Sequence, residues 1–187
     1  GLIVHSGDFK LDFTPFDGET TDLSKFADLG ESGVLCFLSD STNVERQGYT
    51  ISERDIALEL ENVFHNCENR IIVTLFASNL QRIQQIFDIA ARFGRRILLN
   101  GRSIVQSTRL ACSLGALKIR DGQLMDLSEL DKADPRRVVV LCTGSQGEPM
   151  SVLNRIAENN HKQIEIKAGD TVILSSKIIP GNERAVT

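Results

Sequence analysis

The sequence predicts an α/β fold: one open, mostly parallel, doubly wound (Rossmann-like) sheet with helices on both faces. Two observations carry this prediction. Apolar runs of strand length, rich in β-branched residues and without polar alternation, are typical of strands buried on both faces. Stretches with helical periodicity separate these runs, and an alternation of strand and helix implies right-handed crossovers. The runs are VLCFL (34–38), RIIVTLF (70–76), RRILL (95–99), RRVVVLC (136–142) and DTVILS (170–175).

The first predicted helix follows the first of these runs. Ser52, with Asp55 three positions on, resembles a capping box at its start. Apolar residues then recur with helical period, which indicates one buried stripe: Ile56, Leu60, Val63 and Phe64.

Three further helices are predicted between the later runs. LQRIQQIFDIAARF should begin after an Asn79 cap and end at Gly94. The next should run from Ser103, as its cap, to residue 114, and the last over 151–159. Between these two, residues 116–135 break the rhythm. There IRDGQLMD contains an Asp-Gly turn signal with short flanking strands, and KADP predicts a loop.

Composition excludes several classes of protein. The 187 residues suit one domain, or one domain with a fragment of another. The net charge of -4 argues against a generally basic nucleic-acid-coating surface, although it leaves room for a local groove. No apolar run approaches the ~20 residues that span a bilayer, and no signal peptide opens the chain. We therefore expect a cytoplasmic protein without membrane contact.

Cysteine and histidine usage argues against a self-contained metal centre. The cysteines form no C-x-x-C pair and are expected to be reduced structural residues, with Cys36 and Cys142 packed inside strands. The three histidines, His5, His65 and His161, are too scattered to hold a metal alone. The chain begins without Met and stops after an IPGNE segment, so we expect it to be a piece of a longer protein.

Every predicted strand is followed by a loop rich in small hydroxyl, amide and glycine residues. In a parallel sheet such loops meet at the carboxyl edge, where ligands bind. Helix capping accounts for about half of these residues. The rest, with backbone N–H groups and helix N-termini, suit phosphate oxygens. TGSQGEP is predicted to form one wall of a phosphate-handling cleft, although no P-loop or dinucleotide pattern is present. The loops are SDSTN (39–43), ASN (77–79), NGRS (100–103), TGSQGEP (143–149) and SSKIIPGNE (175–183).

The segments HSGDFK, LSDSTN, FASNLQRIQQ, TGSQGEPMS and SSKIIPGNE together are similar to the ribonuclease J family of metallo-β-lactamase-fold nucleases. In that family a β-CASP domain interrupts the metallo-β-lactamase domain, and this chain resembles that insert with short flanks. The resemblance implies a metallo-β-lactamase fragment over 1–15, a β-CASP domain over 16–180 and the start of the return segment over 181–187.

The resemblance also implies roles for single residues. Asp8 would bridge two zinc ions whose other ligands lie outside the chain, so the chain alone should be inactive. Asp40 in LSDSTN would be a catalytic carboxylate beside the metals, able to orient a metal-bound histidine. His65 and His161 match no family motif and are read as surface residues. Contacts to RNA or its phosphates would come from Ser41, Asn43, Ser78, Asn79, Arg82, Thr143, Ser145, Gln146, Ser175 and Ser176.

The implied whole protein is a zinc-dependent ribonuclease for RNA processing and decay, acting as a 5′ exonuclease, an endonuclease or both. Its partners would be RNA, the rest of its own metallo-β-lactamase domain and, as one possibility, further copies of itself. Two alternatives stay open. One is a β-CASP nuclease of another substrate class, for DNA repair or mRNA 3′-end processing. The other is a non-catalytic RNA-binding or scaffold module.

Overall fold

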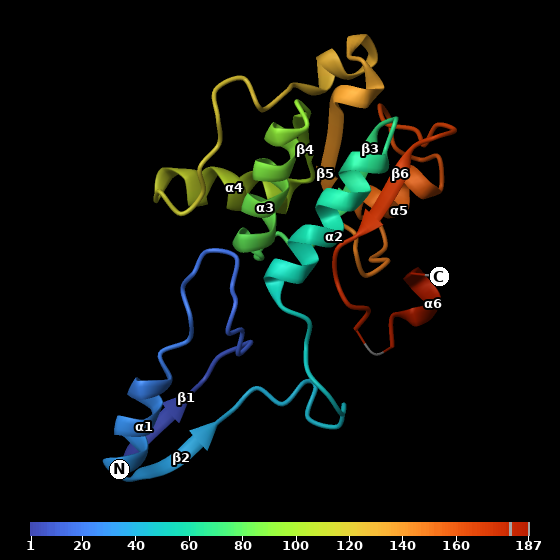
Figure 1. Ribbon diagram of the computed structural model, residues 1–187. Coiled ribbons are helices and arrows are strands. Elements are labelled where there is room, and N and C mark those ends of the chain that lie inside the picture. The colour runs from blue at the N-terminus through green and yellow to red at the C-terminus, as the bar shows by residue number, and fades with distance from the viewer. Residues whose placement is uncertain (180, 187) are drawn as a thin grey trace. The chain divides into compact units, whose positions relative to one another are not determined.

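Two separate parallel sheets form the framework of this α/β fold (Figure 1). The computed structural model describes residues 1–179 and 181–186, so Pro180 within SSKIIPGNE and Thr187 lie outside the described part. The chain divides into two units, one over residues 1–59 and one from residue 60 onward. Each unit contains one of the two sheets, and the predicted fold class is confirmed.

The first unit is a small strand–helix–strand motif. β1 (Leu2–His5) pairs in parallel with β2 (Val34–Leu38), and α1 (Leu23–Glu31) makes the crossover. The Asp22 side chain caps α1 by accepting from Lys25 N at 2.9 Å, and Phe26 packs edge-on against Phe37 with ring centroids 6.4 Å apart. This nine-residue helix was not among those predicted from the sequence.

The prediction that VLCFL is buried in the main sheet is wrong. β2 pairs only with β1, and Cys36, expected to be packed inside a strand, is exposed. Leu35 is 74% exposed and Phe37 53%. A two-stranded sheet with one short helix cannot cover both of its faces, so apolar residues remain at the surface of this unit.

The second unit contains a four-stranded parallel sheet with the order β4-β5-β3-β6. Its strands are β3 (Ile71–Thr74), β4 (Arg96–Asn100), β5 (Val138–Cys142) and β6 (Thr171–Leu174). Their last residues are in register across the sheet, in the order Asn100, Cys142, Thr74, Leu174. The four loops that follow these strands therefore start from one edge, as predicted, whereas SDSTN follows β2 in the other unit.

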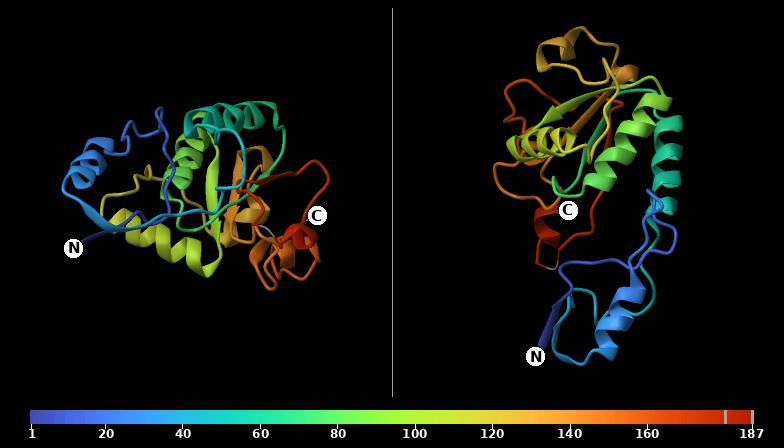
Figure 2. Two further views of the ribbon diagram at one scale, coloured as in Figure 1. Left: turned by 90° about the horizontal axis from the view of Figure 1, so that it is seen from below. Right: turned by 90° about the vertical axis from the view of Figure 1, so that its left-hand side faces the viewer.

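Helices cover both faces of the four-stranded sheet (Figure 2). α3 (Leu80–Arg92) lies on one face together with the part of α2 (Glu53–Asn66) from Leu60 on, and α4 (Arg102–Ser113) and α5 (Val152–Ala157) lie on the other. The central strands are fully enclosed: β3 and β5 are buried along their whole length. α5 contributes Val152 and Ile156 to the core beneath it.

Of the predicted helix caps, the one at the start of α3 is confirmed and the one at the start of α4 is wrong. The Asn79 side chain caps α3 by accepting from Arg82 N at 3.0 Å. At the other end Gly94 has a φ of +63° and Arg95 N donates to Ala90 O, a Schellman closure. The predicted Ser103 cap is wrong, because Gly101 is the N-cap of α4 and makes no side-chain cap.

The strands predicted around the Asp-Gly turn of IRDGQLMD do not pair with each other. Instead the chain runs along the free edge of β4: Ile97 N donates to Gln123 O at 2.8 Å and Met125 N to Ile97 O at 3.0 Å. Only an isolated bridge joins Ile97 and Leu124. Two short 3₁₀ segments follow, Leu127–Lys132 and Pro135–Arg137. The predicted KADP loop is therefore limited to its two middle residues, which lie between these segments. The IRDGQLMD segment pairs with the free edge of β4 instead of forming a hairpin with itself, because an unpaired strand edge offers backbone hydrogen-bond partners.

β6 is the other edge strand, and its exposure alternates along the strand, unlike that of the central strands. A short helix, α6 (Glu183–Val186), ends the described chain. Within the described residues no helix has both the length and the apolar character that a membrane crossing requires.

Candidate functional site

Two carboxylates line one hollow at the end of the two-stranded sheet. β1 and β2 run in parallel, so the segments after His5 and after Leu38 emerge side by side. Asp8 follows β1 and Asp40 follows β2, and both line an open hollow of about 410 Å³. His5, Gly7, Phe37, Leu38 and Ser39 complete its lining. The structure therefore brings together Asp8 and Asp40, which stand 32 positions apart in the sequence.

Asp40 is held from both strands. Its N–H donates to Ser6 Oγ at 3.0 Å, which ties it to the end of β1. Its Oδ1 accepts from Thr42 Oγ1 at 2.7 Å and from Thr42 N at 3.0 Å. These bonds, first the Thr42 hydroxyl and then the Thr42 N–H, lower the pKa of the Asp40 carboxyl, and Phe9 N–H adds to the effect. Asp40 is therefore an ionised carboxylate at neutral pH, and it also closes a local turn with Thr42.

Asp8 is exposed on a tight turn. Gly7 has a φ of +63°, and its N–H donates to His5 Nδ1 at 2.9 Å. That bond occupies one ring nitrogen of His5. An exposed carboxylate next to a histidine is a suitable donor for a metal ion, but a zinc site needs three or four protein ligands. Among the described residues no group of three His, Cys, Asp or Glu side chains could hold a metal. This part of the chain therefore fits a metal only together with ligands from elsewhere.

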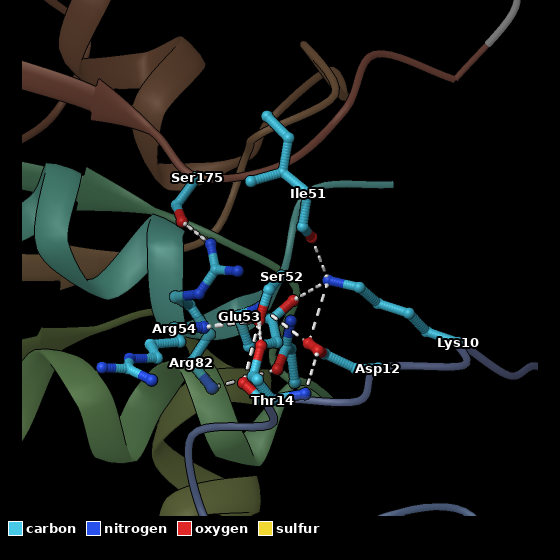
Figure 3. A network of polar contacts seen from close by, with 10 residues as sticks. Lys10, Asp12, Thr14, Ile51, Ser52, Glu53, Arg54, Arg82 and Ser175 are labelled. Atoms are coloured by element: carbon cyan, nitrogen blue, oxygen red, sulfur yellow. Dashed lines mark hydrogen bonds and ion pairs between the residues drawn. The ribbon is translucent and has the colours of Figure 1, made fainter. Parts of the chain in front are cut away.

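The first unit also contains a polar network that local sequence patterns did not indicate (Figure 3). Asp12 Oδ2 accepts from Glu53 N at 2.7 Å and Lys10 Nζ donates to Glu53 Oε1 at 3.0 Å. The Glu53 N–H is the main reason that the pKa of Asp12 is lowered. Ser52 Oγ accepts from Arg54 N at 3.2 Å, so Asp12 and Ser52 share the capping of α2. The partners stand about 40 residues apart, and no short motif reveals such a pair.

A second polar group lies at the carboxyl edge of the four-stranded sheet. Arg82, in the first turn of α3, is 6% exposed and donates from Nη1 to Ser175 Oγ at 2.6 Å (Figure 3). Ser175 follows β6, and its N–H donates to Thr74 O at 2.8 Å. Asn79, Arg82 and Ser175 therefore connect the loop after β3 to the loop after β6. A buried guanidinium next to a hydroxyl and a helix N-terminus is chemistry that suits phosphate oxygens.

The TGSQGEP loop is partly buried. Ser145 is 2% exposed and Gln146 3%, whereas Thr143 is half-buried and Glu148 exposed. The Gln146 side chain is engaged at both ends: Nε2 donates to Lys177 O at 2.8 Å, and Oε1 accepts from Ile179 N at 2.7 Å. The abundance of polar residues after β5 is thus explained in part by contacts inside the protein.

The predicted site residues fall into two groups. Asp8, Asp40, Ser41 and Asn43 belong to the first unit. The others are at the carboxyl edge of the second unit: Ser78, Asn79, Arg82, Thr143, Ser145, Gln146, Ser175 and Ser176. Within the second group, Arg82, Ser145 and Gln146 are buried in this chain, and Ser78 is exposed.

Comparison with known proteins points to a single family. The family model described as the β-CASP domain of ribonuclease J matches residues 68–187. Ribonuclease J of Thermus thermophilus is 50% identical over 186 residues, which is all of this chain and 32% of that protein. Ribonuclease J of Mycolicibacterium smegmatis is 45% identical over the same length.

Ribonuclease J2 of Bacillus subtilis is 43% identical over 183 residues, covering 98% of this chain and 33% of that protein. The chain thus spans about a third of the length of the curated relatives it matches. Because the family model covers well over half of the chain, the chain belongs to the ribonuclease J β-CASP domain family.

Proposed function

We propose that the whole protein is a metal-dependent ribonuclease J that hydrolyses RNA phosphodiesters as a 5′ exonuclease, an endonuclease or both, in the cytoplasm. The observation that carries the proposal is the pair Asp8 and Asp40 in one hollow, at the ends of adjacent parallel strands. It occurs in a chain that resembles ribonucleases J over its full length. This chain alone, with an incomplete ligand set, is expected to be inactive.

In this proposal each carboxylate has a distinct task. Asp8 is one metal ligand, and residues outside this chain supply the other ligands. Zinc, when bound, supplies a Lewis acid and an activated water. Asp40 remains ionised through its Thr42 bonds and would accept the N–H of a histidine that ligates the metal, which would fix the tautomer and orientation of that ring.

The carboxyl edge of the four-stranded sheet is the proposed RNA-facing surface. Arg82 and Ser175 offer a charge-assisted donor and a hydroxyl, and Asn79, Thr143 and Ser78 add small polar groups. Ser41 and Asn43 add two more on the Asp40 turn. Such groups contact phosphates and 2′-hydroxyls rather than base edges, so the proposed recognition depends little on sequence. RNA and the rest of the protein are the proposed partners, and self-association is a further possibility.

The decisive test is Asp40→Asn in the full-length protein. The amide keeps an oxygen for Thr42 but loses the charge, so RNA cleavage should slow by roughly 10- to 1000-fold. Stability should stay close to that of the unaltered protein, because the turn is preserved. Asp28→Asn, at an exposed position on α1, is the matched control and should cleave normally.

Three results would contradict the proposal. Normal cleavage by a folded Asp40→Asn protein would leave Asp40 as a turn residue. Cleavage of DNA in preference to RNA by the unaltered protein would point to a repair-type nuclease. RNA binding without cleavage, with metal present, would point to a scaffold module.

A further inference from the structure

The loop TGSQGEP contacts the segment by which the chain leaves the four-stranded sheet. We name residues 175–179 and 181–186 the exit segment. Gln146 Nε2 donates to Ser176 Oγ at 3.1 Å and to Lys177 O at 2.8 Å, and its Oε1 accepts from Ile179 N at 2.7 Å. One buried amide therefore bonds to three residues of the exit segment.

A second contact of the same loop is steric. Gly147 has a φ of +66°, and a Cβ at this position would collide with the backbone carbonyl of Ala185 in α6. The loop backbone thus packs directly on the far part of the exit segment, which only glycine permits here. Gln146 and Gly147 are adjacent in sequence. Gln146 bonds to residues within 176–179, and Gly147 packs on residue 185.

The loop itself is well fixed. Gly147 N donates to Gly144 O at 3.2 Å and Ser151 N to Glu148 O at 3.1 Å. Leu153 N donates to Thr143 O at 3.1 Å, which attaches the loop to α5. A rigid loop can impose its geometry on the segment that it contacts, and α5 anchors it to the core through Val152.

We infer that Gln146 and Gly147 form a clamp that positions the exit segment, and that Gln146 acts as a positioning residue rather than as an RNA ligand. Gln146 is 3% exposed and its amide already has three partners, so binding RNA would require breaking these bonds. The exit segment begins at Ser175, the partner of Arg82. The clamp therefore sets the place of a hydroxyl at the RNA-facing edge and the direction of the chain beyond it.

The effect on RNA cleavage rests on the proposed function, whereas the clamp itself does not. The clamp is read out by amide hydrogen exchange. Ile179 is 48% exposed, and Gln146 Oε1 accepts the hydrogen bond from its N–H. In full-length Gln146→Leu, exchange of the Ile179 amide should accelerate at least ~10-fold. Gly147→Ala should accelerate exchange at Ala185 and Val186 without removing any polar side chain.

The control is Gln123→Leu, which also removes a buried glutamine. Gln123 is 7% exposed, and its Nε2 donates to Phe87 O, far along the chain from the exit segment. This variant should lose stability in the same way but leave exchange of the exit segment unchanged. A general loosening of the fold is thereby separated from a specific effect of the clamp.

RNA cleavage provides the functional readout. Because misplacement by about 1 Å can cost ~100-fold in rate, Gln146→Leu and Gly147→Ala should each lower kcat by ~10-fold or more. KM should stay within about twofold, since no RNA contact is lost. Gln123→Leu should keep the kcat of the unaltered protein.

Several outcomes would overturn the inference. Unchanged exchange at Ile179 in Gln146→Leu would show that there is no clamp. Accelerated exchange with unchanged kcat in both variants would show that the clamp has no positioning role. A raised KM in Gln146→Leu alone, with normal cleavage by Gly147→Ala, would make Gln146 an RNA ligand. Absence of ribonuclease activity in the unaltered protein would refute the proposed function, and the exchange data would still decide on the clamp.

Discussion

A buried ion pair joins the start of the edge strand β6 to the start of its neighbour β3. Arg70 Nε donates to Asp170 Oδ1 at 3.3 Å, and the two side chains are only 7% and 4% exposed. Asp170 Oδ2 also accepts from Lys167 N at 2.8 Å. The two residues stand directly before β3 and β6, so this pair acts at the amino edge, opposite the loops that follow the strands.

Asp170→Asn should lower the free energy of unfolding by about 3–5 kcal/mol, because it leaves the buried Arg70 guanidinium without a counter-charge. Asp134→Asn breaks an exposed pair with Arg136 and should cost far less, because solvent screens that pair. Urea unfolding of both variants makes the comparison. Equal losses would show that burial of the Arg70–Asp170 pair has no energetic consequence.

His161 makes stability sensitive to acid. It is half-buried, and its Nδ1 accepts from Ile164 N at 3.0 Å and from Gln163 N at 3.3 Å. Burial, and then the nearby Arg155 charge, lower the pKa of His161. The folded state favours the neutral ring. Its contribution is therefore present above the ordinary histidine pKa of about 6.5 and is lost as pH falls through the lower folded value.

His161→Asn should keep the acceptor, since asparagine makes the same type of turn, but it removes the titration. Its free energy of unfolding should therefore fall less than that of the unaltered chain between pH 7 and pH 5. Urea unfolding at a series of pH values tests this. Parallel curves for the two proteins would assign the acid sensitivity to other groups.

Local contacts decide which side chains could be predicted. Asn79 caps α3 through Arg82 N, three positions on, and Thr42, two positions on, closes the Asp40 turn, so a short motif contains both partners. Gln146 and Ile179 stand 33 positions apart. Nothing near Gln146 in the sequence distinguishes a buried amide with three partners from a solvent-facing one.

The start of α4 is set by packing rather than by a side-chain cap. Gly101 has a φ of 122°, and a Cβ there would lie 3.0 Å from Thr143 Oγ1 and 3.3 Å from Val152 Cγ2. Only a glycine lets the loop after β4 approach the loop after β5 this closely. The NGRS motif suggested a serine cap because sequence alone does not show what lies opposite.

Gly101→Ala should destabilise the chain by about 1–3 kcal/mol through strain and contact. Gly115→Ala is a suitable comparison: its φ is +71° and the space around it is open, so only the ~1 kcal/mol strain of a left-handed residue applies. Thermal and urea unfolding of both variants would show the difference. A larger loss for Gly115→Ala would contradict the close approach at Gly101.

All five apolar runs form strands, but burial on both faces was predicted correctly only for the two central strands of the larger sheet. β3 and β5 are central, and their unbroken apolar runs identify them directly. The segment at 34–38 has an equally apolar run, but its sheet partner is β1, and only pairing determines that. The expected hairpin after Asp121 failed for a related reason, because the free edge of β4 was available nearby.

The second unit has an extensive apolar core. Ile71, Ile72 and Val73 are fully buried between helices on both faces, and Cys142 is packed so deeply that burial raises its pKa to about 12. This core contains no group that binds metal among the described residues. We therefore expect its stability to come mainly from apolar burial and not from a bound metal.

The 187-residue chain should accordingly keep its thermal midpoint in the presence of EDTA. A structural zinc ion contributes folding free energy directly, so its removal would lower the midpoint by several degrees. Scanning calorimetry with and without chelator distinguishes the two cases. A clear drop would reveal a structural metal site that includes residues of this chain.

The strand order has a consequence for synthesis on the ribosome. β3 is the first strand of its sheet to be made, yet one of its neighbours, β6, is the last, and Arg70 must wait for a partner 100 residues later. Until β6 emerges, one edge of β3 has no neighbour, and unpaired edges invite wrong pairing. β1 and β2, in contrast, are separated by a single short helix and can pair much earlier. Within this stretch of the nascent chain, β1 and β2 can therefore pair before the four-stranded sheet that carries the clamp is closed.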